Sequence, residues 1–345
     1  MSKGAQPAAG EQITIRSLTR DDLDKVVEID AALGRLAPRR GYFERRLGAA
    51  LAAPELHVQF AAEHAGALVG FALARRLVGE FGAVQPALRL EVIGVERSEQ
   101  GAGIATRLLA RLQQSAVNGG AAEIRTQASW RDGKMLHFLD HAGFSLASDH
   151  VIDCAVRVER FDAADHEERE APETEDSWKT PETDYSAAAD NDFEALGRDR
   201  IEARSLAAGD FDEVARIDRR ITGVDRSAYL RQVFAEALGN SGVRASLVAR
   251  KDQMTVGFVM ARTDFGDFGR AEPVAVLDTI GVDPDFAHAG VGRSLLSQLF
   301  LNLQALRVER LETVVARGDF ALLRFLYAAG FAPAERLAFV RSAVQ

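Results

Sequence analysis

The sequence predicts an α/β protein made of two copies of one domain joined by an acidic linker. Three observations support this prediction. The chain matches itself at an offset of 187 residues, each copy alternates strand-like and helix-like segments, and the segment between the copies is strongly acidic. At 345 residues the chain is long enough for two cores of ordinary size. The predicted domains cover residues 13–156 and 201–345, with the linker at 157–200.

The internal repeat is clearest at residues 69–109, where 17 of 41 positions are identical to the residues 187 positions later. The sequence Ile-Gly-Val at 93–95, for example, recurs at 280–282. This period is much longer than that of a solenoid repeat. It therefore indicates a domain duplication.

Each copy is predicted to form a mixed, mostly antiparallel sheet flanked by helices. Runs of β-branched and aromatic residues indicate strands, and a 3.6-residue apolar period indicates helices. Thr19 is a candidate N-cap for the first helix, and the Asn-Gly-Gly sequence at 118–120 ends a later one. The predicted strands of the first copy are 13–17, 58–63, 68–77, 88–95, one through Ile124, and 151–156, the last of which completes the unit.

The net charge of −9 belongs to the linker. Residues 157–200 hold fifteen acidic and six basic residues, so the two flanking regions together are neutral. No basic stripe marks a binding surface for a phosphate backbone, and we expect no nucleic-acid partner. The linker is also poor in apolar residues, and such a segment buries too little surface to offset its ordering entropy.

The remaining composition predicts a cytoplasmic protein. No apolar run is long enough to span a membrane, and residues 1–12 contain no stretch that would act as a secretion signal. The single cysteine, Cys154, excludes an intramolecular disulfide and fits a reducing compartment. His137 and His141 share one helix face, but no acidic residue completes a zinc motif, so we expect no metal.

The most informative local feature is a strand, a tight turn and a helix in succession. The strand ends at Val95, and the turn contains the sequence Gln-Gly-Ala-Gly-Ile-Ala at 100–105. Small residues let an anion approach the backbone, where unpaired N–H groups and the helix dipole favour a pyrophosphate. Small residues also occur where a helix packs tightly on a strand. Neither a P-loop nor a dinucleotide fingerprint is present.

This turn resembles the Gln/Arg-x-x-Gly-x-Gly/Ala signature of the GNAT superfamily of N-acetyltransferases. The Ala-Gly-Phe sequence at 142–144, repeated at 329–331, is similar to a second motif of that superfamily. The resemblance covers nearly everything outside the linker. It implies two tandem GNAT domains that use acetyl-CoA as substrate.

The resemblance also implies which residues bind the coenzyme. Backbone groups of Ile93 and Val95 in the first copy, and of Ile280 and Val282 in the second, would pair with the pantetheine arm. The second copy departs from the signature, since Ala287 replaces the expected Gln/Arg and His288 a small residue. The residues implied to bind pyrophosphate, including the signature glutamine, are Gln100, Gly101, Ala102, Gly103, Ile104, Ala105, Thr106, His288, Ala289, Gly290, Val291, Gly292 and Arg293.

Two carboxylates are candidates for catalysis. Transfer of an acetyl group to an amine needs a base, because ammonium groups are mostly protonated at neutral pH. Glu91 lies on the strand that would face the thioester, and its counterpart Asp278 keeps the carboxylate. A salt bridge or a solvent-facing position is the alternative for each. By the resemblance, a β-bulge on this strand would free an N–H for the thioester carbonyl.

A general acid is not assigned. The tyrosine that many GNAT enzymes carry four residues before the Gly-Phe glycine is Leu139 in one copy and Leu326 in the other. The usual asparagine at the start of that helix corresponds to Asp132 and Asp319, and either is also a candidate N-cap.

Three hypotheses for function follow. The first is an N-acetyltransferase that moves acetyl from acetyl-CoA directly to a small-molecule or peptide amine. In the second, one copy is catalytic and the other is a structural or coenzyme-sensing partner. The third is a non-enzymatic regulator that binds acetyl-CoA. The sequence does not identify the acceptor, and it is compatible with an oligomer or with pairing of the two domains within the chain.

Overall fold

The structure is a computed structural model, and it describes residues 13–33, 39–77, 86–156, 201–239, 245–265 and 273–344. The predicted linker at 157–200 lies outside these residues. None of the helices in the described ranges combines the length and hydropathy that a membrane crossing requires.

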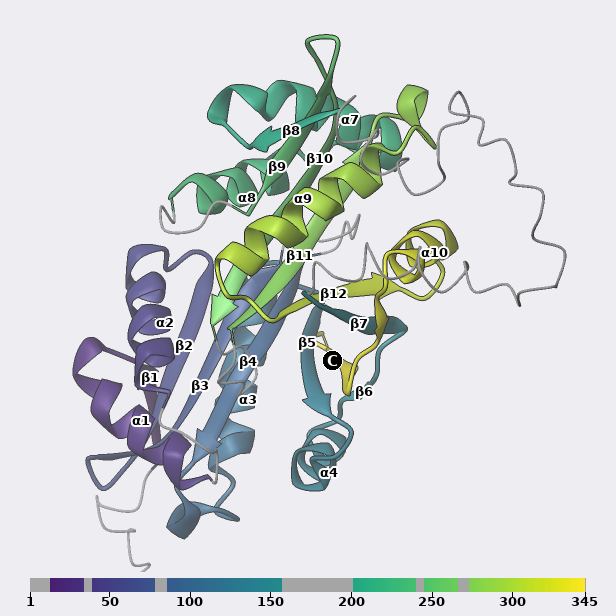
Figure 1. Cartoon of the computed structure of the whole chain (residues 1–345). Helices are drawn as coiled ribbons and strands as arrows, with labels where there is room; N and C mark the ends of the chain where they lie inside the picture. The colour runs from purple at the N-terminus through teal and green to yellow at the C-terminus, as the bar shows by residue number, and fades with distance from the viewer. Residues whose placement is uncertain are drawn as a thin grey trace, which may run out of the picture.

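The first copy has the predicted succession of strands and helices (Figure 1). A second helix after the first, and a two-residue strand near the end, are additions to the prediction. Its elements are β1 (Thr14–Ser17), α1 (Leu23–Ala32), α2 (Arg40–Ala52), β2 (His57–His64), β3 (Ala67–Leu77), β4 (Ala87–Val95), α3 (Ile104–Asn118), β5 (Glu123–Ser129), α4 (Gly133–His141), β6 (Ser145–Leu146) and β7 (Asp149–Ala155).

The second copy repeats this order, as the duplication predicts. Its elements are β8 (Glu202–Ser205), α7 (Phe211–Thr222), α8 (Ser227–Gly239), β9 (Leu247–Lys251), β10 (Met254–Phe265), β11 (Pro273–Val282), α9 (Val291–Ala305), β12 (Arg310–Ala316), α10 (Phe320–Ala328), β13 (Ala332–Pro333) and β14 (Arg336–Ser342).

The described strands form two seven-stranded sheets, in the orders β1-β2-β3-β4-β5-β14-β6 and β13-β7-β12-β11-β10-β9-β8. Five neighbouring strands of each sheet, β1 to β5 in one and β8 to β12 in the other, come from a single copy. Pairing is antiparallel except between β4 and β5 and between β11 and β12. This mixed, mostly antiparallel arrangement with flanking helices confirms the predicted α/β class.

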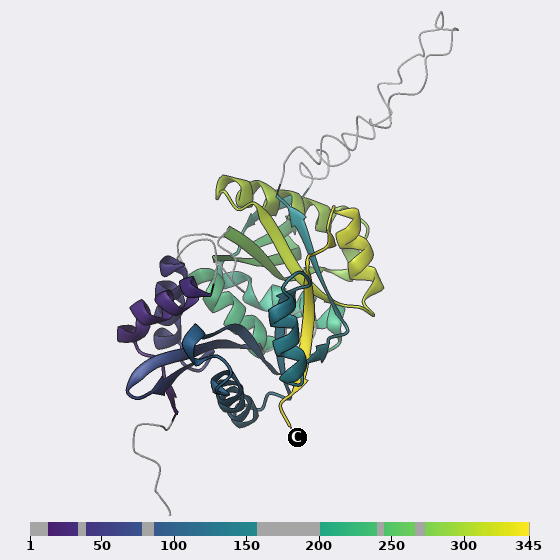
Figure 2. The ribbon, with the colours of Figure 1, turned by 90° about the horizontal axis from the view of Figure 1, so that it is seen from below.

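The two copies exchange their last strands. β14, from the second copy, pairs antiparallel with β5 of the first, from Arg336 opposite Ser129 to Ser342 opposite Glu123. Reciprocally, β7 pairs with β12. Viewed from below, the yellow C-terminal strand reaches the teal part of the first copy (Figure 2). The expectation that the strand at 151–156 completes its own unit is therefore wrong.

The hydrophobic pattern of the sequence does not distinguish a hairpin from an exchanged strand. Only residues 147 and 148 separate β6 from β7. Instead of turning back as a hairpin, the chain continues into the neighbouring sheet. A hairpin and an exchanged strand satisfy the same backbone groups and bury the same alternating side chains. The hydrophobic pattern of β7 is thus compatible with either arrangement.

The exchanged strands contribute to the cores of their host sheets. Phe339 and Ala343, at the end of the chain's second copy, are buried in the core formed beneath α3. Ile152 and Cys154, on β7, are buried in the core beneath α9. Each fully buried side chain of the size of isoleucine or phenylalanine contributes about 1.5–3 kcal/mol. Each core is therefore completed by the other copy.

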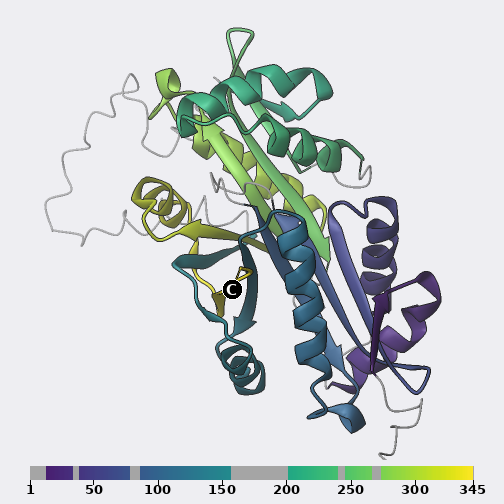
Figure 3. The same ribbon diagram turned by 180° about the vertical axis from the view of Figure 1, so that it is seen from behind.

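Helices cover both faces of each sheet. In the first copy α3 packs on one face through Leu108 and Leu112, and α1 and α2 pack on the other through Val26 and Phe43. Figures 1 and 3, which view the molecule from opposite sides, show these two layers. In the second copy α9 takes the place of α3, and α7 and α8 take the place of α1 and α2.

Candidate functional site

The two parallel strand pairs diverge soon after they begin. β4 pairs with β5 only from Ala87 to Arg89, and β11 pairs with β12 only from Val274 to Val276. Beyond these residues the second half of β4 or β11 has no ladder partner on that side among the described strands. In each copy the two strands therefore separate, and we call the region between the unpaired part of the longer strand and its former partner the wedge.

A threonine hydroxyl marks the point where each pair separates. Thr126 on β5 donates from Oγ1 to the carbonyl of Leu90 across 2.9 Å, and Thr313 on β12 donates to Leu277 at the same distance. Both threonines are buried. The hydroxyl thus satisfies the first carbonyl that the ladder no longer reaches, which is a requirement for buried backbone groups.

Both candidate carboxylates lie on β-bulges. In the pairing of β3 with β4, Leu73 is opposite Val92 and Ala74 is opposite Leu90, so Glu91 is the extra residue. In the pairing of β10 with β11, Asp278 is skipped in the same way. A bulge re-aims one side chain and leaves one residue outside the ladder. The bulge expected on this strand is present in both copies, directly beside each wedge.

The first phosphate-loop candidate has the geometry that its glycines suggest. Gly101 and Gly103 have φ values of +90° and +77°, and the space where a Cβ would lie is open at both. The helix α3 begins at Ile104, directly after Gly103. The N–H groups of its first turn have no helical partner and lie at the positive end of the helix dipole. Gln100 donates from Nε2 to the carbonyl of Val95 across 3.1 Å, which ties the loop to β4.

The second loop has the same backbone with a different side chain at one strained position. Gly290 has a φ of +80°, as its counterpart Gly103 has +77°. His288, the counterpart of Gly101, takes a φ of +61° although it is not glycine. A Cβ on Gly292 would approach the ring of Phe325 to 3.0 Å, so this position is closely covered by α10. Arg293 is exposed beside the loop.

The four strand residues expected to face the pantetheine arm lie along the wedges. Ile93 and Val95 are in the part of β4 beyond its pairing with β5, and Ile280 and Val282 take the same places on β11. Ile93 and Val95 are buried, and Ile280 and Val282 are partly buried. Their backbone edges therefore border the wedges.

Glu91 is held by two arginines. Arg46 on α2 donates from Nε to Oε2 across 2.6 Å, and Arg89 donates from Nη2 to Oε1 across 2.9 Å. Burial alone would raise the pKa of this carboxyl, but the charges of Arg46, Arg89 and Arg75 outweigh that effect and hold the pKa well below its usual range. The carboxylate is therefore ionised at neutral pH, and its basicity is reduced.

Asp278 is also paired with an arginine. Its two carboxylate oxygens accept hydrogen bonds from Nε of Arg262 at 2.9 and 3.0 Å. Arg262 is the counterpart of Arg75 at the offset of 187. The hydroxyl of Tyr229, on α8, lies 3.5 Å from the carbonyl of Asp278. The salt-bridge alternative considered for both carboxylates is thus present in the structure.

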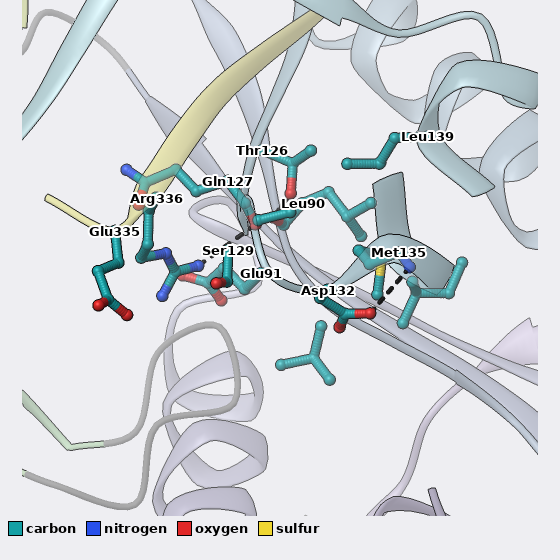
Figure 4. A pocket seen from close by; sticks show the side chains of 13 residues that line it. Leu90, Glu91, Thr126, Gln127, Ser129, Asp132, Met135, Leu139, Glu335 and Arg336 are labelled. Atoms are coloured by element: carbon teal, nitrogen blue, oxygen red, sulfur yellow. Dashed lines mark hydrogen bonds between the residues drawn. The ribbon is translucent and has the colours of Figure 1, made fainter. Parts of the chain in front are cut away.

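A pocket of about 220 Å³ opens in the wedge of the first copy (Figure 4). Strand β4 contributes one wall, β5 and α4 contribute another, and the residue before β14 together with its first residue contributes the last. The lining residues are Leu90, Glu91, Val92, Ile93, Thr126, Gln127, Ala128, Ser129, Asp132, Met135, Leu139, Glu335 and Arg336.

In neither copy does the helix after the parallel strand pair, α4 or α10, carry a general acid at the position that the family resemblance suggests. Leu139 and Leu326 are buried apolar residues. Asp132 accepts a hydrogen bond from the backbone N–H of Met135 at 3.0 Å, and Asp319 accepts one from Leu322 at 3.0 Å. Both aspartates are therefore N-caps, as one of the two interpretations proposed.

Three groups of residues at this site were not predicted from the sequence. Thr126 and Thr313 are exact counterparts in the repeat, so the internal match contained a signal for them. Arg46 and Arg89 correspond to Val233 and Val276, and no repeat signal points to them. Glu335 and Arg336 enter the first pocket only because of the strand exchange. Within the described residues there is no group of three metal-ligating side chains.

Comparison with known proteins identifies relatives of both halves. A family model described as Acetyltransferase (GNAT) family matches residues 25–144 and 211–331. No curated protein matches the chain.

Three solved structures illustrate the likeness over the full chain. A tandem GNAT protein from the clavulanic acid biosynthesis pathway has a TM-score of 0.57 at 16% identity, with 97% of this chain and 99% of that chain covered. A GCN5-related N-acetyltransferase from Sphaerobacter thermophilus has a TM-score of 0.56 at 14% identity, with 96% of each chain covered. The glucosamine N-acetyltransferase region of a fungal multi-domain β-N-acetylglucosaminidase has a TM-score of 0.60 at 15% identity. That match covers 96% of this chain and 38% of the fungal one.

Proposed function

The chain belongs to the acetyltransferase (GNAT) family, and on that premise we propose that it is an N-acetyltransferase which transfers acetyl directly from acetyl-CoA to an amine. The observation that carries the proposal is the duplicated wedge, in which an open strand edge, a bulge and a loop with left-handed residues lie in succession. Direct transfer requires donor and acceptor to meet at one centre, and in this proposal both would enter the wedge.

The coenzyme would bind along each wedge and loop. The arm would pair with the backbone of Ile93 and Val95, or of Ile280 and Val282. The pyrophosphate would take the N–H groups of residues 101–106 in the first copy and 288–293 in the second. Glycines with positive φ and open space above them support this assignment, because backbone amides there are accessible to an anion.

The acceptor amine must lose a proton during the reaction. Glu91 and Asp278 are our candidates for receiving it, either directly or through a water molecule. Their positions on the bulges support this role, whereas their arginine partners reduce their strength as bases. If Glu91 acts as the base, replacing it with glutamine would lower kcat. If it only holds Arg46 in place, the loss would be in stability.

A second candidate function assigns catalysis to one copy alone. The different residues at the second loop favour this hypothesis, because His288 adopts a conformation that costs a non-glycine residue energy and Ala287 stands where Gln100 ties the first loop to β4. The second copy would then be a structural or coenzyme-sensing partner. The buried Leu139 and Leu326, at the place expected for a general acid, favour a third candidate, a regulator that binds acetyl-CoA without turnover.

Calorimetric titration of the whole chain with acetyl-CoA tests these proposals together. Two binding events, one lost in Gly103→Asp and the other in Gly290→Asp, are expected if both loops bind the coenzyme. A single event would assign binding to the copy whose variant abolishes it. Release of coenzyme A with a panel of amines separates an enzyme from a regulator. Absence of both heat and thermal stabilisation would overturn coenzyme binding in both copies.

A further inference from the structure

The pocket of the first copy is completed by the second copy. Of its lining residues, Glu335 and Arg336 belong to the segment that leads into the exchanged strand β14. Arg336 lies opposite Ser129 in the register of β14 with β5. Figure 4 shows both side chains at the side of the pocket away from α4, with Arg336 directed toward Glu91 and Ser129. The exchange therefore delivers two charged groups into a site built on another copy.

Several contacts hold this segment in place. The backbone N–H of Trp130 donates to the carbonyl of Glu335 at 3.2 Å, and the guanidinium of Arg131 lies 2.9 Å from the Glu335 carboxylate. Arg336 donates from Nη2 to the carbonyl of Gln127 across 3.3 Å. The segment is thus fastened to the end of β5 directly before α4 begins, and the wall that it forms is pre-organised.

The pocket lining carries charges of both signs. Three carboxylates line it, and each has a partner: Glu91 is paired with Arg46 and Arg89, Asp132 caps α4, and Glu335 is paired with Arg131. Arg336 is the cation among the lining residues, and only 7% of its surface is exposed. A guanidinium presents five N–H donors in a planar fork that matches a carboxylate.

We infer that Arg336 binds a carboxylate of the acceptor, so that the first copy acetylates amines that also carry an acidic group. This inference rests on the proposed acetyltransferase function and specifies its substrate class. In such a zwitterionic acceptor, the acidic group would meet Arg336 and the ammonium group would lie near the carboxylates of the pocket lining. The acceptor specificity of the first copy then resides in a residue of the second.

Coenzyme A release with matched pairs of amines tests the inference. 4-Aminobutyrate with 4-aminobutanamide, and 5-aminopentanoate with 5-aminopentanamide, differ in a carboxylate and not in the reacting amine. The wild-type chain is expected to favour the carboxylate member of at least one pair by about 10- to 100-fold in kcat/KM, the range for a hydrogen bond to a charged group. Arg336→Gln is expected to abolish this preference through KM, and Arg336→Lys to retain part of it.

Arg341→Gln is the matched control. Arg341 lies on the same strand, and its guanidinium bonds Oε1 of Gln113 on α3 at 3.0 Å, away from the pocket. This variant is expected to keep the preference, and melting temperatures of all variants report on folding. Turnover without any preference for carboxylates, or a preference that survives Arg336→Gln, overturns the inference and leaves the acetyltransferase proposal standing. Absence of acetyl-CoA binding overturns both.

Discussion

Arg46 on α2 donates a hydrogen bond from Nε to Oε2 of Glu91 across 2.6 Å, and both side chains are almost fully buried. This pair joins a helix above the sheet to the bulge beside the wedge. The same guanidinium donates from Nη2 to the carbonyl of Ala74 at 2.8 Å. One arginine thus links α2, β3 and β4 at the candidate active site.

Removing Arg46 is expected to destabilise the protein strongly. Arg46→Met leaves the Glu91 carboxylate buried with one hydrogen-bonded arginine fewer, and breaking a buried ion pair costs about 3–5 kcal/mol. Urea unfolding followed by circular dichroism measures the change. Glu44→Met, at an exposed position on the same helix, is expected to change stability by less than about 0.5 kcal/mol. If adding Glu91→Gln to Arg46→Met brings a further full loss instead of a partial recovery, the two residues are not coupled.

We expect two equivalent ion pairs, Arg16–Asp22 and Arg204–Asp210, to contribute to the loss of unfolding free energy at low pH. Hydrogen bonds from Arg16 hold the pKa of Asp22 below its usual range, and the pKa of Asp210 beside Arg204 is also lowered, although burial opposes it. A lowered folded-state pKa contributes stability above the unfolded value of about 3.9, and this contribution is lost as the pH falls toward the folded value.

Asp22→Asn and Asp210→Asn are therefore expected to flatten the fall in unfolding free energy below about pH 4, while lowering stability at pH 7. Unfolding titrations at a series of pH values measure both effects. Asp140→Asn, at an exposed position of α4, controls for the loss of one negative charge. An unchanged slope in both variants would contradict the assignment.

The residue types at equivalent positions 101 and 288 of the two candidate phosphate loops can be swapped by mutation. His288 has a φ of +61° where its counterpart Gly101 has +90°. Since the left-handed region costs a residue with a Cβ about 1–2 kcal/mol, His288→Gly is expected to stabilise the protein by about 1 kcal/mol, and Gly101→His to destabilise it by a similar amount. Calorimetric melting of the two variants tests this. Changes of the same sign in both would show that backbone conformation does not govern these positions.

The strand exchange predicts where a core mutation acts. Phe339 is on β14 but is buried in the core of the first copy. Phe339→Ala is expected to cost about 3–5 kcal/mol and to increase hydrogen exchange in β5, its host strand. Phe331→Ala, in the core of the second copy, should instead act on β12. Mass-spectrometric hydrogen exchange distinguishes the two. Faster exchange in β12 from the Phe339 variant would refute the exchanged arrangement.

Much of the architecture was accessible from the sequence because the duplication presents each signal twice. The glycines at 101 and 103, the strand before them and the helix after them were predicted together, and the structure has them in that order. The bulges at Glu91 and Asp278 were expected on the correct strand from the family resemblance. These features depend on local backbone geometry, which short stretches of sequence encode.

The features that escaped prediction depend on contacts between distant segments. Arg46 meets Glu91 only because α2 packs over the bulge, and nothing in the spacing of 45 residues indicates it. The placement of Arg336 in the first pocket follows from the choice between a hairpin and an exchanged strand. That choice leaves the hydrophobic pattern unchanged, so it is decided by the tertiary structure of the whole chain.

The exchanged strand also imposes an order on biosynthesis. β5 is complete at residue 129, but its partner β14 extends to residue 342. During translation the nascent first copy must wait, with the edge of β5 open, until more than two hundred further residues have been made. Its pocket cannot be assembled before then. Residues 1–156 produced as a separate fragment are therefore expected to need the remainder of the chain, supplied in trans, to recover a complete first site.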